Sequence, residues 1–170
     1  LVVTGELVER LRVVELINAE LMTNRHSAPV KERNRGVSPG ELVVCLAETQ
    51  LGGGDCFSDL DDLRYDEAGR WLRAIAPVPA PTTALGLTKR FRRSHLQAVE
   101  RALARAGEAF DRELGREPTA SVTIDLDAIG IEVYGPQKEG ARPSYTGDLA
   151  YQAHVATWAE RGRSLCSELM

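Results

Sequence analysis

Residues 121–134 read Ser-Val-Thr-Ile-Asp-Leu-Asp-Ala-Ile-Gly-Ile-Glu-Val-Tyr, and this stretch decides which fold the sequence is expected to adopt. Its first half alternates apolar with polar residues, the pattern of a β-strand whose successive side chains point to opposite faces. Asp125 and Asp127 therefore share one face of the predicted strand. Strands are normally poor in Asp, so the pair needs an explanation. One explanation is a site for a hard divalent cation, and the other is a strand face turned to solvent.

Two further strands are predicted after this one. Residues 135–147 are rich in Gly and Pro and indicate a loop, whereas residues 149–158 and 163–169 have the pattern of a hairpin that turns at about Glu160 to Gly162. Gly130 interrupts the first strand, which favours a β-bulge at that position. The second part of the chain is therefore predicted to begin an antiparallel sheet.

The first part of the chain is predicted to be helical. Apolar residues recur at helical spacing from Leu7 to Leu21, which favours one amphipathic helix. Ser38 and Glu41 form a capping box with Pro39 at the first helical position, and Gly52 ends that helix. Four more helices are expected: residues 58–65 capped by Ser58 and Asp61, residues 71–76, a basic helix capped by Thr82 or Thr83, and residues 96–114 opened by Ser94 and Gln97 and stopped by Gly115.

These patterns together predict an α+β chain with two domains. Gly115 and Pro118 separate the helical patterns from the strand patterns, so we expect a helical domain at residues 1–118 and a second domain at residues 119–170. The composition is 43% hydrophobic and 27% charged, with no apolar run approaching the roughly 18 residues of a membrane span. The sequence therefore predicts no contact with a membrane.

Positive charge is concentrated in one short segment. The chain has a net charge of −4, yet Lys89, Arg90, Arg92 and Arg93 place four cations within five positions. Such a segment can neutralise DNA phosphates, although a charge run can also be an ordinary solvated face. The helix predicted at 71–76, the Pro-rich turn after it and the basic helix have the proportions of a helix-turn-helix. Residues 82–97 are therefore predicted to bind DNA.

A series of short segments along the chain resembles the N-terminal part of DDE-type transposases of bacterial insertion sequences. The segments that carry this resemblance are residues 38–42, 47–55, 59–64, 78–83, 124–128, 132–135, 138–141 and 154–160. The resemblance implies a helix-turn-helix-like domain followed by the first antiparallel strands of a truncated RNase H-like catalytic domain. It also implies metal-dependent DNA cleavage and strand transfer at transposon ends.

The resemblance assigns roles to the two acids of the first strand. The first member of the Asp-Asp-Glu triad maps onto Asp127, but Ile129 stands where the family carries Ser or Thr, so Asp125 remains a second candidate for this catalytic and metal-binding position. The cofactor implied is Mg²⁺ or Mn²⁺, expected only in a protein that also carries the other two acids. Two such ions would activate the attacking oxygen and stabilise the leaving one.

The reading of the whole chain follows from these expectations. The sequence begins with Leu1 and ends inside an apolar pattern, so we expect a fragment that lacks the rest of the triad and is inactive by itself. Its expected partner is the double-stranded DNA of transposon terminal repeats in a bacterial cytoplasm, and a homodimer is left open. Two alternatives remain: a DNA-binding or dimerising transposase remnant without catalysis, and an unrelated helical interaction module.

Overall fold

The computed structural model describes residues 2–24, 28–33, 35–75, 77–116, 121–135, 138 and 140–169. Within these residues the chain is α+β, with six α-helices followed by a four-stranded antiparallel sheet. It divides into two compact units, unit 1 at Leu1–Arg116 and unit 2 at Glu117–Met170. The boundary predicted between residues 118 and 119 falls in a segment outside the described residues.

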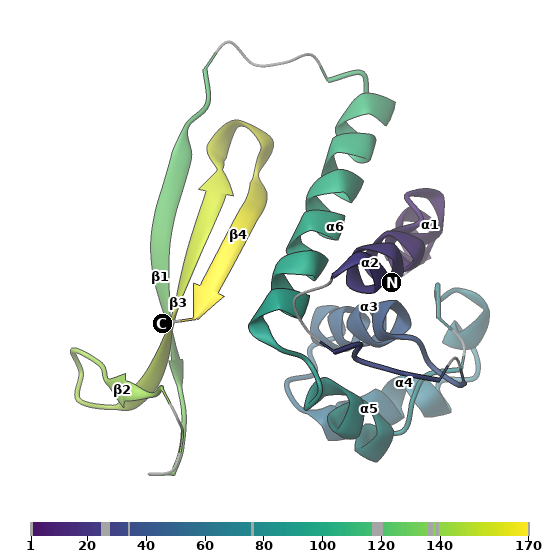
Figure 1. Cartoon of the computed structure of the whole chain (residues 1–170), viewed down its shortest axis with the longest axis horizontal. Helices are drawn as coiled ribbons and strands as arrows, with labels where there is room; N and C mark the ends of the chain where they lie inside the picture. The colour runs from purple at the N-terminus through teal and green to yellow at the C-terminus, as the bar shows by residue number, and fades with distance from the viewer. Residues whose placement is uncertain are drawn as a thin grey trace. The chain divides into compact units, whose positions relative to one another are not determined.

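Unit 1 contains all the α-helices that the structure describes. They are α1 (Val2–Arg10), α2 (Val13–Thr23), α3 (Pro39–Leu51), α4 (Leu60–Tyr65), α5 (Pro81–Thr88) and α6 (Arg93–Glu113), with single 3₁₀ turns at Phe57–Asp59 and Gly69–Trp71. The longest helix, α6, packs against α2, which also contacts α3 (Figure 1). Ile17, Leu42 and Leu60 are fully buried in the core that these helices share.

Polar contacts with α6 and with α3 hold α2 in this core. Glu20 accepts a salt bridge from Arg105 at 2.8 Å and another from Arg101 at 3.1 Å, both of which reach it from α6. The Asn18 side-chain oxygen accepts from the backbone N–H of Gly40 at 2.8 Å, which joins α2 to the start of α3.

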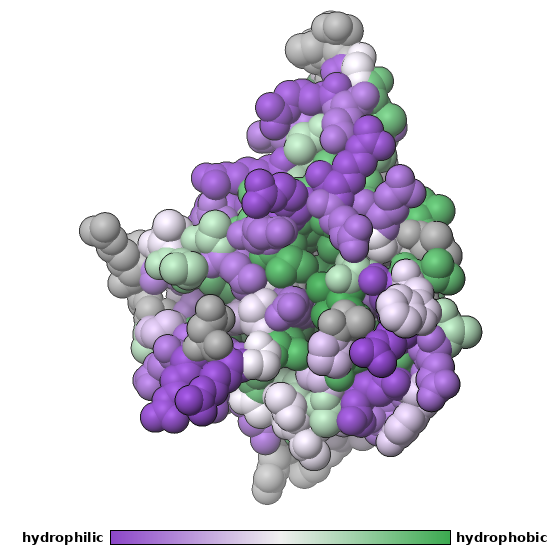
Figure 2. All heavy atoms as spheres, turned by 90° about the vertical axis from the view of Figure 1, so that its right-hand side faces the viewer, coloured by the Kyte–Doolittle hydropathy of each residue, from purple (hydrophilic) through white to green (hydrophobic). Residues whose placement is uncertain are grey.

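Figure 2 shows one face of the molecule, on which hydrophilic side chains predominate and apolar ones are visible between them.

The predicted start and end of α3 are confirmed. Ser38 accepts from the backbone N–H of Glu41 at 3.2 Å, and the Glu41 carboxylate accepts from the Ser38 N–H at 2.6 Å. Pro39 begins the helix and Leu51 ends it, one residue before Gly52. The predicted stop of the long helix at Gly115 is also confirmed, because Gly115 has a φ of 62° just after α6.

The single helix predicted from Leu7 to Leu21 is wrong, because the chain turns at its middle. Arg12 adopts the left-handed conformation, with φ of 52° and ψ of 43°, and separates α1 from α2. A Cβ added at Gly5 would lie 2.6 Å from the carbonyl oxygen of Leu72, so α1 packs directly on that backbone. The turn at Arg12 lets α1 follow this surface while Leu11 stays buried at the corner.

The helix predicted at residues 71–76 is also wrong. Only a 3₁₀ turn at Gly69–Trp71 forms there, and Ala76 lies outside the described residues. The Asp66 carboxylate accepts from the Gly69 N–H at 2.8 Å, and the buried Arg73 donates to the Asp66 carbonyl at 2.9 Å. These bonds fold the segment back on itself instead of extending a helix. The helix-turn-helix predicted from this segment therefore lacks its first helix.

Unit 2 is a sheet built around one central strand. β3 (Leu149–Trp158) pairs with β1 (Ile124–Glu132) on one side and with β4 (Arg163–Leu169) and the two-residue β2 (Arg142–Pro143) on the other. The predicted hairpin is confirmed, with a 3₁₀ turn at Ala159–Arg161 and Gly162 in the left-handed conformation. The β-bulge predicted at Gly130 is wrong, because β1 pairs with β3 without interruption and the irregularity lies at Ala156 and Thr157 against β4.

Candidate nucleic-acid interface

The four predicted DNA-binding cations lie in a turn and not on a helix of their own. α5 begins at Pro81 and ends at Thr88, so Lys89, Arg90 and Arg92 occupy the connection to α6, and Arg93 is the first residue of α6. The prediction of a basic helix capped by Thr82 or Thr83 is therefore wrong; Ala80 holds the N-cap position. All four cationic side chains are exposed.

An apolar and a polar anchor explain why this turn presents its cations outward. Phe91, in the middle of the turn, packs against the core of unit 1 and meets the His95 ring edge to face, with ring centres 6.1 Å apart. His95 is 2% exposed, and its Nδ1 accepts from the Arg92 N–H at 3.0 Å. This bond caps α6 in place of the Ser94 and Gln97 box that the sequence predicts.

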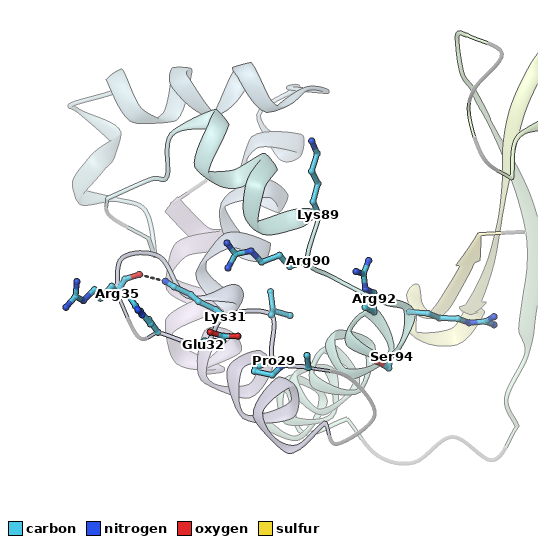
Figure 3. A pocket seen from close by; sticks show the side chains of 12 residues that line it. Pro29, Lys31, Glu32, Arg35, Lys89, Arg90, Arg92 and Ser94 are labelled. Atoms are coloured by element: carbon cyan, nitrogen blue, oxygen red, sulfur yellow. Dashed lines mark hydrogen bonds between the residues drawn. The ribbon is translucent and has the colours of Figure 1, made fainter.

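A second segment, which carries Lys31, Arg33 and Arg35, faces the turn across a groove of about 1090 Å³. These three cations and one acid, Glu32, line the groove together with the four cations of the turn (Figure 3). The full lining consists of Ala28, Pro29, Val30, Lys31, Glu32, Arg33, Arg35, Lys89, Arg90, Arg92, Arg93 and Ser94. We call this the basic groove. Its seven cations against one acid make it strongly electropositive, in a chain whose net charge is negative.

The sequence analysis missed the cations of this second segment. Lys31, Arg33 and Arg35 alternate with Glu32 and Asn34, so they form no uninterrupted charge run. They also lie more than fifty positions from Lys89, and nothing in one sequence indicates that the two segments meet. The alternation of basic residues between Pro29 and Gly36 was the one available signal.

The acidic strand is placed as the sequence predicts, with Asp125 and Asp127 at alternate positions of β1. Asp127 stands opposite Val155 of β3, and Asp125 stands opposite Thr157. Both carboxylates are exposed, and the Asp127 Oδ1 accepts from the Ala128 N–H at 2.7 Å. Ile129 and Ile131 continue the same face and are about half exposed.

This arrangement offers a cation two carboxylates from one strand, which fits part of a divalent-metal site. Among the described residues, the one group of three potential ligands within 4.8 Å is Asp55, Cys56 and Asp59. The Asp59 carboxylate there accepts from the N–H groups of Asp55 and Cys56, at 2.8 and 3.0 Å. Hydrogen bonds from the Cys56 thiol and these N–H groups lower the pKa of Asp59. We therefore assign this group to capping of the turn before α4.

The start of β1 is held by a carboxylate that the sequence analysis did not single out. Glu160, in the hairpin turn, accepts from the Thr123 hydroxyl at 2.7 Å and from the Thr123 N–H at 3.0 Å. These bonds lower the pKa of Glu160 to about 2, and the bond from the hydroxyl has the largest effect. The contact fixes the chain at Thr123, just before the start of β1 and two residues before Asp125.

Unit 1 also buries an acid and a thiol away from the groove. Glu48 of α3 is fully buried near Arg73 and the backbone of Ala74, and desolvation raises the pKa of its carboxyl group. Burial, reinforced by Glu48, raises the pKa of the Cys45 thiol to about 12. A thiol held in its protonated form is a poor nucleophile and metal ligand, so Cys45 belongs to the core.

Comparison with family models, with curated proteins and with solved structures gave no match for this chain. No helix in the described part of the chain combines the length and the hydrophobicity that a membrane span requires.

Proposed function

We propose that this chain contributes to transposition of an insertion sequence, with unit 1 binding the DNA of the transposon ends and unit 2 carrying the first acid of a DDE catalytic triad. The observation that carries the proposal is the basic groove, because it gathers the four cations predicted to bind DNA on one electropositive surface. Cations that neutralise phosphates release condensed counterions, which drives binding of proteins to DNA. Because the sequence resembles transposases, we propose that the DNA bound is that of the transposon ends.

We further propose that α5, the basic turn and α6 form the helix pair that docks on DNA. In helix-turn-helix proteins the N-terminal residues of the second helix contact base edges in the major groove. Arg93 and Gln97 stand one turn apart at the start of α6, and both are exposed. The exposure of Gln97 supports a role in contacting base edges, and the exposure of Arg93, like that of Lys89 and Arg90, supports a role in contacting phosphates.

For unit 2 we propose the beginning of an RNase H-like domain. Three long antiparallel strands with the acidic strand β1 at one edge of the sheet agree with the order in which such a domain opens. Asp127, or Asp125 in its place, would help to hold Mg²⁺ or Mn²⁺, and these ions would polarise the phosphate and activate the attacking oxygen. Glu160 would act from the hairpin turn by keeping the start of β1 in register.

A second candidate function is DNA binding without catalysis. It is favoured by one observation: within the described residues, no third potential ligand joins Asp125 and Asp127 to form a group of three. A chain with the basic groove and an incomplete metal site could occupy transposon ends without cutting them. This candidate shares the DNA-binding role of unit 1 with the first.

DNA binding is tested by changing the four turn cations, Lys89, Arg90, Arg92 and Arg93, to Ala together. Four lost phosphate contacts should lower the affinity for a labelled duplex by at least tenfold in a fluorescence anisotropy titration at low salt. The matched control changes Arg70 and Arg112, two exposed arginines outside the groove, and should leave the affinity within twofold. Equal affinity of the four-cation variant and the wild type would reject the proposal.

Catalysis is tested in a version of the protein that includes the remaining acids of the triad. Asp127→Asn should abolish Mg²⁺-dependent strand cleavage and leave DNA binding intact, because it removes ligand charge at constant volume. Asp125→Asn should have a milder effect. If only the Asp125 variant loses cleavage, Asp125 holds the catalytic position; if both variants cleave normally, β1 is not the catalytic strand.

A further inference from the structure

We infer that the segment of residues 28–33 and 35–37 is a second DNA-contacting wall, so that the basic groove holds the sugar-phosphate backbone of a duplex between this segment and the turn 89–93. The inference rests on the proposed DNA-binding function and extends it to residues that the sequence analysis did not select. Arg33 and Arg35 are its contacting residues, and both are exposed at the groove. Lys31 is a positioning residue that holds them in place.

The lining of the groove favours phosphates over bases or small molecules. No aromatic side chain is among the described residues that line it, whereas proteins that bind single strands stack bases on aromatic rings. Pockets for small molecules are predominantly apolar, and this one is predominantly cationic. A rigid polyanion meets these conditions, and the backbone of a duplex is such a polyanion.

Lys31 donates two hydrogen bonds within its own segment. Its ammonium group donates to the carbonyl of Arg35 (Figure 3). It also donates, at 2.6 Å, to the carbonyl of Val37. These bonds link Lys31 to the backbone at Arg35 and Val37, so Lys31 closes the loop to which Arg33 and Arg35 belong. Lys31 is therefore expected to act on DNA through the loop that it closes.

The two walls are tied to the same core, so the groove exists before any ligand binds. Val30, 4% exposed, belongs to the core cluster of unit 1 at the base of the loop. Asn24, at the end of α2, donates to the Ser94 hydroxyl at 3.3 Å and so joins the end of α2 to the start of α6. A preformed groove loses little entropy on binding, which favours a fixed set of phosphate contacts.

The experiment compares four variants of the whole chain, together with the four-cation turn variant described above, by anisotropy titration over a range of salt concentrations. A labelled duplex of arbitrary sequence and its single strand are the probes. Arg33→Ala combined with Arg35→Ala should reduce the slope of log affinity against log salt by about 1.8, since each phosphate contact contributes about 0.9. Lys31→Met should reduce the slope by more than the 0.9 of one charge, and Lys31→Arg should restore it. The control variant, with Arg70 and Arg112 changed to Ala, should keep the wild-type slope.

The outcomes separate this inference from the proposal on which it rests. If the loop variant keeps the wild-type slope while the four-cation turn variant loses affinity, unit 1 binds DNA without the second wall and the inference is wrong. If neither variant changes the affinity, both the inference and the DNA-binding proposal are wrong. If the single strand binds more tightly than the duplex, the groove is not built for a duplex backbone. Circular dichroism of each variant excludes loss of folding as the cause.

Discussion

His95 shows how one buried residue decides where a helix begins. The sequence contains a plausible capping box at Ser94 and Gln97, but the structure uses the imidazole of His95 to accept from the Arg92 N–H. Burial of His95 against Phe91 selects this cap, and burial is a tertiary property that a single sequence does not reveal. The capping residue was therefore beyond prediction, although the helix itself was not.

We expect His95→Ala to destabilise the protein by about 1–3 kcal/mol, because it leaves the Arg92 N–H without its acceptor and opens a cavity. Gln97→Ala, at the exposed position of the box that the sequence suggests, should change stability by less than about 0.5 kcal/mol. Urea denaturation followed by circular dichroism measures both. If the Gln97 variant were the less stable of the two, the capping assignment would be reversed.

Glu160 gives a prediction about pH. Its carboxyl group titrates at about 2 in the folded protein, below its ordinary value of 4.5, because Thr123 donates to the ionised form. The stabilisation that it provides is therefore fully present above about pH 4.5 and is lost as the pH falls through 2. An NMR titration of the side-chain carboxyl carbon should give a midpoint near 2, and Thr123→Val should raise it towards 4.5. A wild-type midpoint near 4.5 would show that the hydrogen bonds from Thr123 to Glu160 do not form in solution.

Individual elements were predictable where local chemistry defines them. The capping box of α3 and the hairpin of β3 and β4 depend on residues that are neighbours in sequence, and both appear where predicted. The break at Arg12 accompanies a contact with a distant segment, that of Gly5 with the backbone of Leu72. The missing helix at 71–76 accompanies bonds from Gly69 and Arg73 to Asp66, which a hydrophobic pattern does not reveal. Patterns of hydrophobicity continue across Arg12, so they could not reveal that the backbone turns there.

Gly40 tests how closely two of these elements approach. A Cβ at this position in α3 would lie 2.6 Å from the Val14 carbonyl oxygen and 3.0 Å from the Asn18 side-chain oxygen, both on α2. Gly40→Ala should therefore destabilise the protein by about 1–3 kcal/mol, as overpacking does. Gly86→Ala is the matched control, since open space surrounds that position in α5; it should stabilise by about 0.4–1 kcal/mol. Chemical denaturation of the two variants should give shifts of opposite sign, and shifts of the same sign would contradict the close approach of α2 and α3.

At the scale of the whole molecule, the two units differ in how well they bury their own apolar residues. Unit 1 surrounds a core of Ile17, Leu42 and Leu60, whereas Ala150 is the one buried side chain among the residues described in unit 2. Leu126 is 81% exposed on one face of the sheet, and Ile129 and Ile131 are about half exposed on the other. A small sheet with apolar residues exposed on both faces has little independent stability.

Residues 1–116 expressed alone should therefore give the circular dichroism of a helical protein and a cooperative thermal transition. Residues 117–170 expressed alone should lack a cooperative transition, because none of the residues described in this segment covers the exposed apolar side chains of β1. Circular dichroism melts of both segments measure this. A cooperative melt for the strand segment, or none for the helical one, would show that the two units do not differ in this way.

The candidate site was predicted only in part, for a reason that applies to the whole chain. The four cations at Lys89–Arg93 could be found because they lie within five positions, and Asp125 and Asp127 because they share a strand. The loop that faces the cations could not be found, because only the folding of unit 1 brings residues 28–35 to residues 89–94.

The most direct test of the account is the salt dependence of duplex binding by the unmodified chain. The groove offers six cations for phosphates, Arg33, Arg35, Lys89, Arg90, Arg92 and Arg93, once Lys31 is set aside for its structural role. Titration of a labelled duplex over a range of salt concentrations should then give a slope of log affinity against log salt of about −5, at about −0.9 for each phosphate. A slope near zero, or no binding at low salt, would contradict the assignment of the groove to DNA.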